Sequence, residues 1–155
     1  MTGEEKISYS QVSLPSELDG FITVSAEFEG HMFSHTEADL ESFRQKLSDP
    51  HAFQLLAIKD HNKPVAYLGA SESLFPGHLF IFELLVDSSA QGLGIGRSMV
   101  KQAIEFARKE ELKGVYVETE SWNTPGQKLY ENCGFKQVNN PDWKEGVTLL
   151  IAFCL

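Results

Sequence analysis

The sequence is poor in cysteine and has no long apolar run, and each shortage excludes a class of protein. Only Cys133 and Cys154 occur among 155 residues. Two cysteines are too few for a disulfide framework and are typical of reduced thiols in a cytoplasmic protein. No apolar run approaches the ~18 residues that a membrane-spanning helix needs. The first residues, MTGEEKISYS, lack the apolar centre of a signal peptide. We therefore expect a cytoplasmic location and no membrane partner.

Positive charge is also scarce. Lys and Arg number 13 against 22 Asp and Glu, which gives a net charge of −9. Nucleic-acid binding depends on clustered Lys and Arg, so we expect no nucleic-acid partner. The acidity suits a cationic small molecule as substrate, and it suits a role in solubility alone equally well.

The length and the order of predicted elements indicate one α/β domain. A chain of 155 residues favours a single domain, residues 1–155. Turn signals and apolar periodicity predict the order β, α, α, β, β, β, α, β, α, β, β, in which antiparallel hairpins precede strand–helix–strand units around a mixed sheet. The strands are expected at Lys6–Ser13, Ala52–Asp60, Lys63–Ser71, Leu79–Asp87, Gly114–Glu120, FKQV and GVTLLIAFCL. The helices are expected from Ser16, from Thr36, from the end of a glycine-rich loop to Lys109, and around Pro125.

The glycine-rich loop holds Gly92, Gly94 and Gly96 between a predicted strand and a predicted helix. The dinucleotide fingerprint G-x-G-x-x-G does not fit, because Arg97 or Met99 occupies its third small position. The phosphate loop G-x-x-x-x-G-K-[ST] also fails, since no Lys-Ser or Lys-Thr pair follows a glycine. What remains is a turn whose free amides and helix dipole form an anion site, with Arg97 adding positive charge. The alternative is a tight turn that holds nothing.

Two segments in this half of the chain carry a family resemblance. QGLGIG, from Gln91, resembles the Q/R-x-x-G-x-G/A signature of the GNAT family of N-acetyltransferases, and it follows ELLVD, which looks like the family's fourth strand. NTPGQKLYENCGF, from Asn123, is similar to the family's second segment, N-x-x-A-x-x-L-Y-x-x-x-G-F, with Gly126 where alanine is usual. The resemblance implies the acyl-CoA N-acyltransferase fold, in which a mixed sheet is splayed between its fourth and fifth strands and flanked by about four helices.

The resemblance also implies acetyl-CoA as cosubstrate and direct transfer of its acetyl group to a primary amine in a ternary complex. The pyrophosphate would lie on the amides from Gly92 to Ser98, and backbone groups of Leu85 and Val86 would pair with the pantetheine arm. Asn123 would bond the same arm, although a helix cap before Pro125 explains it equally well. The implied cofactor-binding residues are Leu85, Val86, Gln91, Gly92, Leu93, Gly94, Ile95, Gly96, Arg97, Ser98, Asn123 and Tyr130.

Transfer to an amine requires a base, because a free alkylamine is mostly protonated at neutral pH. Glu83 interrupts an apolar strand, where burial raises the pKa of a carboxyl and suits it to that task. The alternative is a structural carboxylate, and Glu118 and Glu120 on the next strand are rival bases. Tyr130 would protonate the leaving thiolate by the family pattern, and plain packing of its ring is the alternative reading.

The sequence does not identify the amine acceptor. A small-molecule amine is the leading hypothesis, a protein or peptide amine is the alternative, and a non-catalytic coenzyme A-binding sensor is a third reading. His31 and His35 are spaced i, i+4, but no H-E-x-x-H pattern surrounds them, so we expect no metal. The apolar strand VTLLIAFCL suits an interface in a homodimer.

Overall fold

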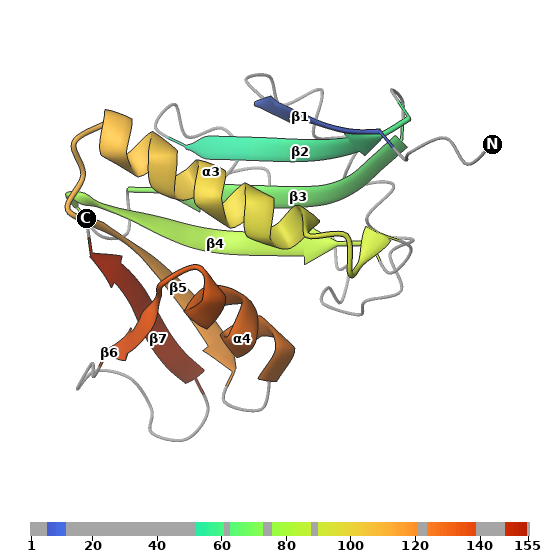
Figure 1. Ribbon diagram of the computed structural model, residues 1–155. Coiled ribbons are helices and arrows are strands. Elements are labelled where there is room, and N and C mark those ends of the chain that lie inside the picture. The colour runs from blue at the N-terminus through green and yellow to red at the C-terminus, as the bar shows by residue number, and fades with distance from the viewer. Residues whose placement is uncertain are drawn as a thin grey trace, which may run out of the picture.

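The computed structural model describes residues 6–11, 52–60, 63–72, 76–87, 90–120, 124–138 and 148–154. They form a seven-stranded sheet that carries two described helices (Figure 1). The strands are β1 (Ile7–Gln11), β2 (Phe53–Lys59), β3 (Lys63–Ser71), β4 (His78–Val86), β5 (Gly114–Glu120), β6 (Lys136–Val138) and β7 (Thr148–Cys154). The helices are α3 (Ile95–Lys109) and α4 (Thr124–Asn132). The helices predicted from Ser16 and Thr36, and the histidines His31 and His35, lie outside the described residues.

The sheet is mixed, as the element order predicts. Its strand order is β1-β2-β3-β4-β5-β7-β6. Neighbouring strands run antiparallel except β4 and β5, which run parallel. The predicted strands Lys63–Ser71 and Gly114–Glu120 match β3 and β5 at both ends, and the other strands end within a few residues of their predicted bounds. The closing strand β7 lies between β5 and β6, so it is not an edge strand of this sheet.

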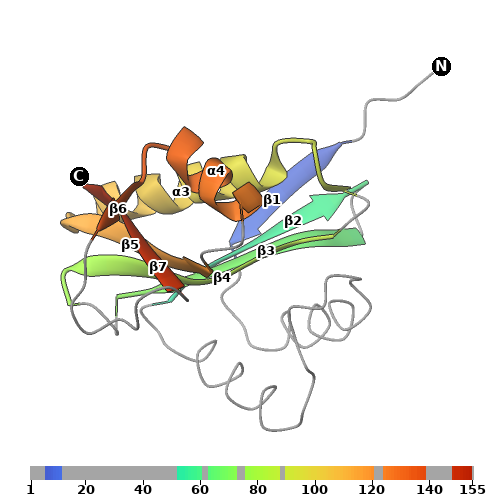
Figure 2. The ribbon, with the colours of Figure 1, turned by 90° about the horizontal axis from the view of Figure 1, so that it is seen from below.

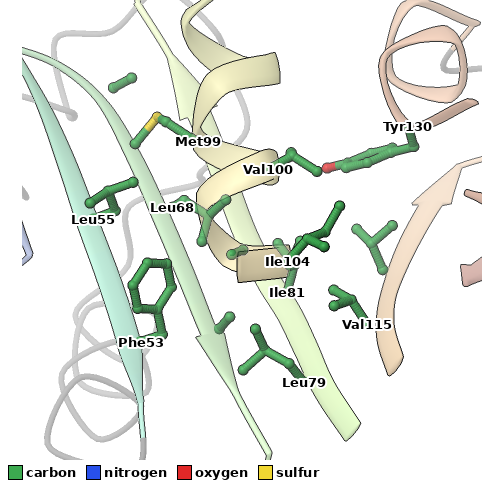
Figure 3. Packing of buried hydrophobic residues seen from close by; sticks show 14 of the residues in the cluster. Phe53, Leu55, Leu68, Leu79, Ile81, Met99, Val100, Ile104, Val115 and Tyr130 are labelled. Atoms are coloured by element: carbon green, nitrogen blue, oxygen red, sulfur yellow. The ribbon is translucent and has the colours of Figure 1, made fainter. Parts of the chain in front are cut away.

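Both described helices cover the same face of the sheet (Figure 2). The apolar stripe predicted for α3 is its buried side, formed by Ile95, Met99, Val100, Ala103, Ile104 and Ala107. These side chains pack against residues of β2 to β5 such as Leu68 and Leu79 (Figure 3). At the other end of the helix, the Phe106 ring stacks on Phe53 with ring centroids 4.6 Å apart. The helix is therefore fixed along its length over the centre of the sheet.

A β-bulge at Phe82 sets the face on which the candidate base Glu83 lies. Ala70 on β3 pairs with Ile81, whereas its neighbour Gly69 pairs with Glu83, so Phe82 is the extra residue. Ala70 and Ile81 belong to the core beneath α3. Because consecutive strand residues point to opposite faces, Gly69 and the opposed Glu83 lie on the face away from α3. The bulge thus removes Glu83 from the main core.

The sheet divides between β4 and β5. The two strands pair only from His78 to Ile81 on β4 and from Gly114 to Val117 on β5. Beyond this ladder β4 continues beside β3, and β5 continues beside β7. Figure 1 shows the two strands diverging toward their carboxyl ends. The predicted splay between the fourth and fifth strands is therefore confirmed.

Candidate active site

The open side of β4 presents backbone groups toward the split. The amide of Asp87 donates to the carbonyl of Val65 on β3 at 2.8 Å. Backbone groups alternate in direction along a strand, so those of Leu85 also face β3, and those of Leu84 and Val86 face away from it. The register favours Leu84 and Val86, rather than Leu85, as residues whose backbone groups can take an added partner.

The glycine-rich loop enters α3 through the left-handed region of backbone space. Gly92 has a φ of 82° and Gly94 a φ of 77°, which L side chains rarely adopt. Gly94 is the N-cap of α3, makes no side-chain cap hydrogen bond, and is followed by a first turn without acidic residues. The amides of Ile95, Gly96 and Arg97 have no acceptor within the helix, because a helix leaves its first N–H groups unpaired. Unpaired amides at a helix N-terminus and the helix dipole are an arrangement that can bind an anion.

The loop is attached to the end of β4 and to α4. The side-chain amide of Gln91 donates to the carbonyl of Val86 at 3.4 Å. A Cβ built on Gly96 would lie 3.5 Å from Cδ2 of Leu129 and 3.7 Å from Cγ2 of Val86. The first turn of α3 is therefore wedged between the end of β4 and α4, beside the split.

Gly94→Ala should lower the free energy of unfolding by about 1–2 kcal/mol, because an L side chain is strained at positive φ. A Cβ at Gly94 would meet nothing within 4 Å, so a steric clash adds nothing to this cost. Gly96→Ala is the matched control, since Gly96 is helical and its Cβ would make ordinary contacts. Chemical denaturation of both variants measures the difference. Equal losses in the two would contradict the assignment of strain to Gly94.

Tyr130 lies on the helix-covered face, close to α3. It is 6% exposed and belongs to the main core cluster. Its ring meets Phe135 edge to face, with centroids 5.6 Å apart. Figure 3 shows the Tyr130 hydroxyl directed from α4 toward Val100 of α3. The Tyr130 ring is therefore packed in the core, and this packing directs its hydroxyl toward the region between α3 and α4.

The candidate bases lie on the opposite face. Glu83 is half-buried, and Glu118 is exposed. Glu118 follows Val117, the last residue of β5 that pairs with β4. Since Val117 lies in the core beneath the helices, Glu118 lies on the face that holds Glu83. The side chain of the other rival base, Glu120, lies outside the described part of the chain. The structure brings Glu83 and Glu118 to the two sides of the split.

Cys133 lies near two positively charged side chains, but its thiol is not activated as a nucleophile. Burial raises the pKa of its thiol, and the nearby charges of Arg97 and Lys101 lower it in part. The net shift is upward, so the thiol stays protonated at neutral pH.

Cys133→Ser should therefore leave kcat of any reaction at this site unchanged, because a protonated thiol is a poor nucleophile. Steady-state rates of the variant and the parent protein test this. A severe loss of kcat in a folded variant would contradict it and would indicate a covalent step at Cys133.

Most predicted loop residues gather at the N-terminus of α3. Gln91 to Gly94 and Arg97 are exposed, Leu93 being 51% exposed, and Ile95 is buried. Ser98 is half-buried and accepts a hydrogen bond from Gln102 at 3.4 Å. Asn123 lies outside the described residues. A cavity of about 220 Å³ opens elsewhere, toward the C-terminal end of α3, and is lined in part by Phe106 and Glu110.

Sequence reasoning did not single out Leu84, Tyr67 or Gln54. Leu84 emerges only from the hydrogen-bond register of β4. Tyr67 and Gln54 read as ordinary strand residues, and only their side-chain contact near Glu83 distinguishes them. Within the described ranges, no group of three His, Cys, Asp or Glu side chains is placed to hold a metal ion. Neither described helix is long and apolar enough to cross a membrane.

Comparison with known proteins defines the class. Residues 20–135 match the acetyltransferase (GNAT) family. The matched range contains the glycine-rich loop, the split between β4 and β5, and Tyr130. The chain belongs to the GNAT acetyltransferase family.

Relatives and solved structures agree with this membership. An uncharacterised N-acetyltransferase of Schizosaccharomyces pombe is 26% identical over 141 residues, which cover 88% of this chain and 86% of that protein. The ribosomal-protein-S18-alanine N-acetyltransferase from Escherichia coli has a TM-score of 0.74 at 16% identity, over 96% of this chain and 94% of that one. A putative streptothricin acetyltransferase from Bacillus anthracis, in complex with acetyl coenzyme A, has a TM-score of 0.62 at 20% identity, over 73% and 68%. The fold is that of the GNAT acyl-CoA N-acyltransferases.

Proposed function

We propose that the protein transfers the acetyl group of acetyl-CoA to the primary amine of a small molecule. The observation that carries this proposal is the uncapped N-terminus of α3, entered through Gly92 and Gly94 and attached to β4 where that strand leaves β5. Membership of an acetyltransferase family supports the class of reaction. The identity of the acceptor goes beyond what family membership shows.

The residues at the loop fit a pyrophosphate. A Cβ at Gly92 or Gly94 would meet nothing within 4 Å, so an anion can approach the backbone there. Helix-terminal amides from Ile95 to Arg97 are donors without intrahelical acceptors, and Arg97 is exposed beside them. We propose that this turn holds the pyrophosphate of acetyl-CoA, with the implied residues Gln91, Gly92, Leu93, Gly94, Ile95, Gly96, Arg97 and Ser98 around it, and Asn123 near its arm.

Backbone groups at the split fit the rest of the cosubstrate. Leu84 and Val86 direct N–H and C=O groups to the side that β5 leaves open, so an extended amide-containing arm can pair there like an added strand. When bound, acetyl-CoA supplies an activated acetyl group with a thiolate leaving group.

We propose opposite proton-transfer roles for Glu83 and Tyr130, which lie on opposite faces of the split sheet. Glu83 accepts a proton from the acceptor ammonium, directly or through water, and so provides a neutral amine. Tyr130 donates its hydroxyl proton toward the leaving sulfur from the helix-covered face. The acceptor therefore enters from the face that carries Glu83, and the cosubstrate lies between the two residues.

A small cationic amine fits the acceptor face best. Glu83 and Glu118 both lie on this face, and the protein has a net charge of −9.

We also propose a cytoplasmic location and a homodimer. The two cysteines suit a reducing compartment.

The function is tested by the release of free thiol from acetyl-CoA. The acceptor panel contains polyamines, aminoglycosides, streptothricin, amino acids and short peptides, with a blank that lacks an acceptor. We expect release above the blank with one class of small amine. Release with peptides alone would replace the small molecule by a protein acceptor. Binding of acetyl-CoA without release by any member would contradict these acceptor classes and would leave two readings, an acceptor outside the panel or a binding protein without catalysis.

A further inference from the structure

Two consecutive residues of β4, Phe82 and Glu83, direct their side chains to the same face of the sheet. Ile81 before them belongs to the core beneath α3, and Leu84 after them packs against it. Side chains of a regular strand alternate between the two faces, whereas the bulge adds one residue and lets two neighbours share a face. The Phe82 ring and the Glu83 carboxylate therefore both lie on the face away from α3.

Gly69 on β3 leaves the space in which the Phe82 ring lies. A Cβ built on Gly69 would lie 2.6 Å from Cε2 and from Cζ of Phe82, which is closer than real Cβ atoms approach. The far end of the ring thus reaches across to Gly69, the residue that pairs with Glu83. Any side chain at Gly69 would displace the ring, so the glycine determines where the ring lies.

The end of the Phe82 ring and the Glu83 carboxylate are close to the same buried hydroxyl. The Cβ that would clash with the ring would also clash with the hydroxyl of Tyr67. Burial raises the pKa of Tyr67, and the negative charge of Glu83 raises it further, so the carboxylate is near this hydroxyl. Phe82 and Glu83 are both half-buried, and each therefore keeps some surface that a ligand can contact.

This arrangement places an apolar surface beside the candidate base. An amine that gives a proton to Glu83 brings the carbon atoms next to its nitrogen toward the Phe82 ring. Apolar surface buried there gains roughly 25 cal/mol per Å², whereas a second charged group placed against the ring would lose hydration. Glu118, which is exposed, lies across the split on β5 and not beside the ring.

We propose that Phe82 is a specificity-determining residue, and that the acceptor is a primary amine with one ammonium group and an apolar alkyl or aryl body. The ammonium group lies at Glu83, and the apolar body lies against the Phe82 ring. Gly69 is a positioning residue that acts through this ring. The inference rests on the proposed acetyl transfer and narrows its acceptor to one class of amine.

The test compares three amines that differ beyond the first carbon atoms. Phenethylamine carries an aromatic ring, ethylamine lacks it, and putrescine has a second ammonium group in its place. Thiol release gives kcat and KM for each amine, and calorimetry with coenzyme A bound gives the Kd of each amine without turnover. The variants are Phe82→Ala, Phe82→Leu, Gly69→Ala and the double variant of Phe82→Ala with Gly69→Ala. Phe106→Ala is the matched control, because it removes another half-buried ring, one that stacks on Phe53 away from Glu83.

We expect the parent protein to bind phenethylamine at least about tenfold more tightly than ethylamine or putrescine, as burial of an aromatic group predicts. Phe82→Ala should remove most of this preference through KM and leave kcat and the Kd for acetyl-CoA near the parent values. Phe82→Leu keeps an apolar side chain and should lose less. Gly69→Ala should weaken phenethylamine binding by displacing the ring, and it should add little in the Phe82→Ala background, where no ring remains.

Three results would overturn the inference. One is equal binding of the three amines, or tighter binding of putrescine, by the parent protein. Another is a preference for phenethylamine that survives in Phe82→Ala. The third is an equal loss of the preference in Phe106→Ala, which would attribute it to general loosening of the fold. If no amine released thiol, the proposed function would be refuted, and the Kd values measured with coenzyme A would still decide whether Phe82 selects the amine.

Discussion

Glu83→Gln lowers kcat/KM for the acceptor amine by roughly 10²–10⁴-fold, the range typical of a lost general base. Glutamine keeps the size of the side chain and its place opposite Gly69, but it cannot accept a proton from an ammonium group. The affinity for acetyl-CoA should stay unchanged, because the proposed cosubstrate residues lie at the glycine-rich loop and the open side of β4. Thiol release and a separate binding titration measure the two quantities.

Glu118→Gln is the matched control for this prediction. Glu118 is also a carboxylate on the acceptor face beside the split, but it is exposed, whereas Glu83 is half-buried. Its loss should weaken acceptor binding through KM and leave kcat near the parent value. A larger loss of kcat in Glu118→Gln than in Glu83→Gln would transfer the role of base to β5.

Tyr130→Phe is the second large effect, with a fall in kcat on the order of 10²-fold. Phenylalanine retains the ring, its edge-to-face contact with Phe135 and its place in the core, so the free energy of unfolding should change little. The hydroxyl that would protonate the leaving sulfur is removed. The rate should therefore fall while the Kd for acetyl-CoA remains the same.

Single-turnover kinetics with saturating acetyl-CoA, together with thermal denaturation, test the Tyr130 prediction. Phe135→Leu is a useful comparison, because it disturbs the same ring contact without removing a hydroxyl. An unchanged kcat in Tyr130→Phe would leave packing as the whole role of Tyr130. An equal loss of rate in Phe135→Leu would attribute the effect to ring position.

Strand bounds were predictable where local signals surround a strand. The turn-forming sequence DHNK leads into β3, and Gly114 begins β5, and both strands match their predicted ranges. The bulge at Phe82 was not predictable, because register depends on cross-strand pairing that a single sequence does not show. That bulge decides which face Glu83 occupies.

The candidate site was also predictable only in part. Alternating glycines before a helical stripe predict a turn at the start of a helix, and the structure has this turn, with Gly92 and Gly94 at positive φ. The sequence predicted that backbone groups of Leu85 and Val86 pair with the cosubstrate, whereas the register turns those of Leu84 and Val86 away from β3. The hydrogen bond between Tyr67 and Gln54 joins residues on two strands, and neither segment alone predicts it.

The central claim is that acetyl-CoA binds on the amides at the start of α3, beside the split between β4 and β5. An amide NMR titration of the nitrogen-15 labelled protein with acetyl-CoA tests it most directly, because glycine amides fall in a distinct part of the spectrum. The account predicts the largest saturable shifts at Gly92, Gly94 and Gly96, with smaller ones at Leu84 and Val86. Shifts confined to other parts of the chain, or no saturable shift at these glycines, would contradict it.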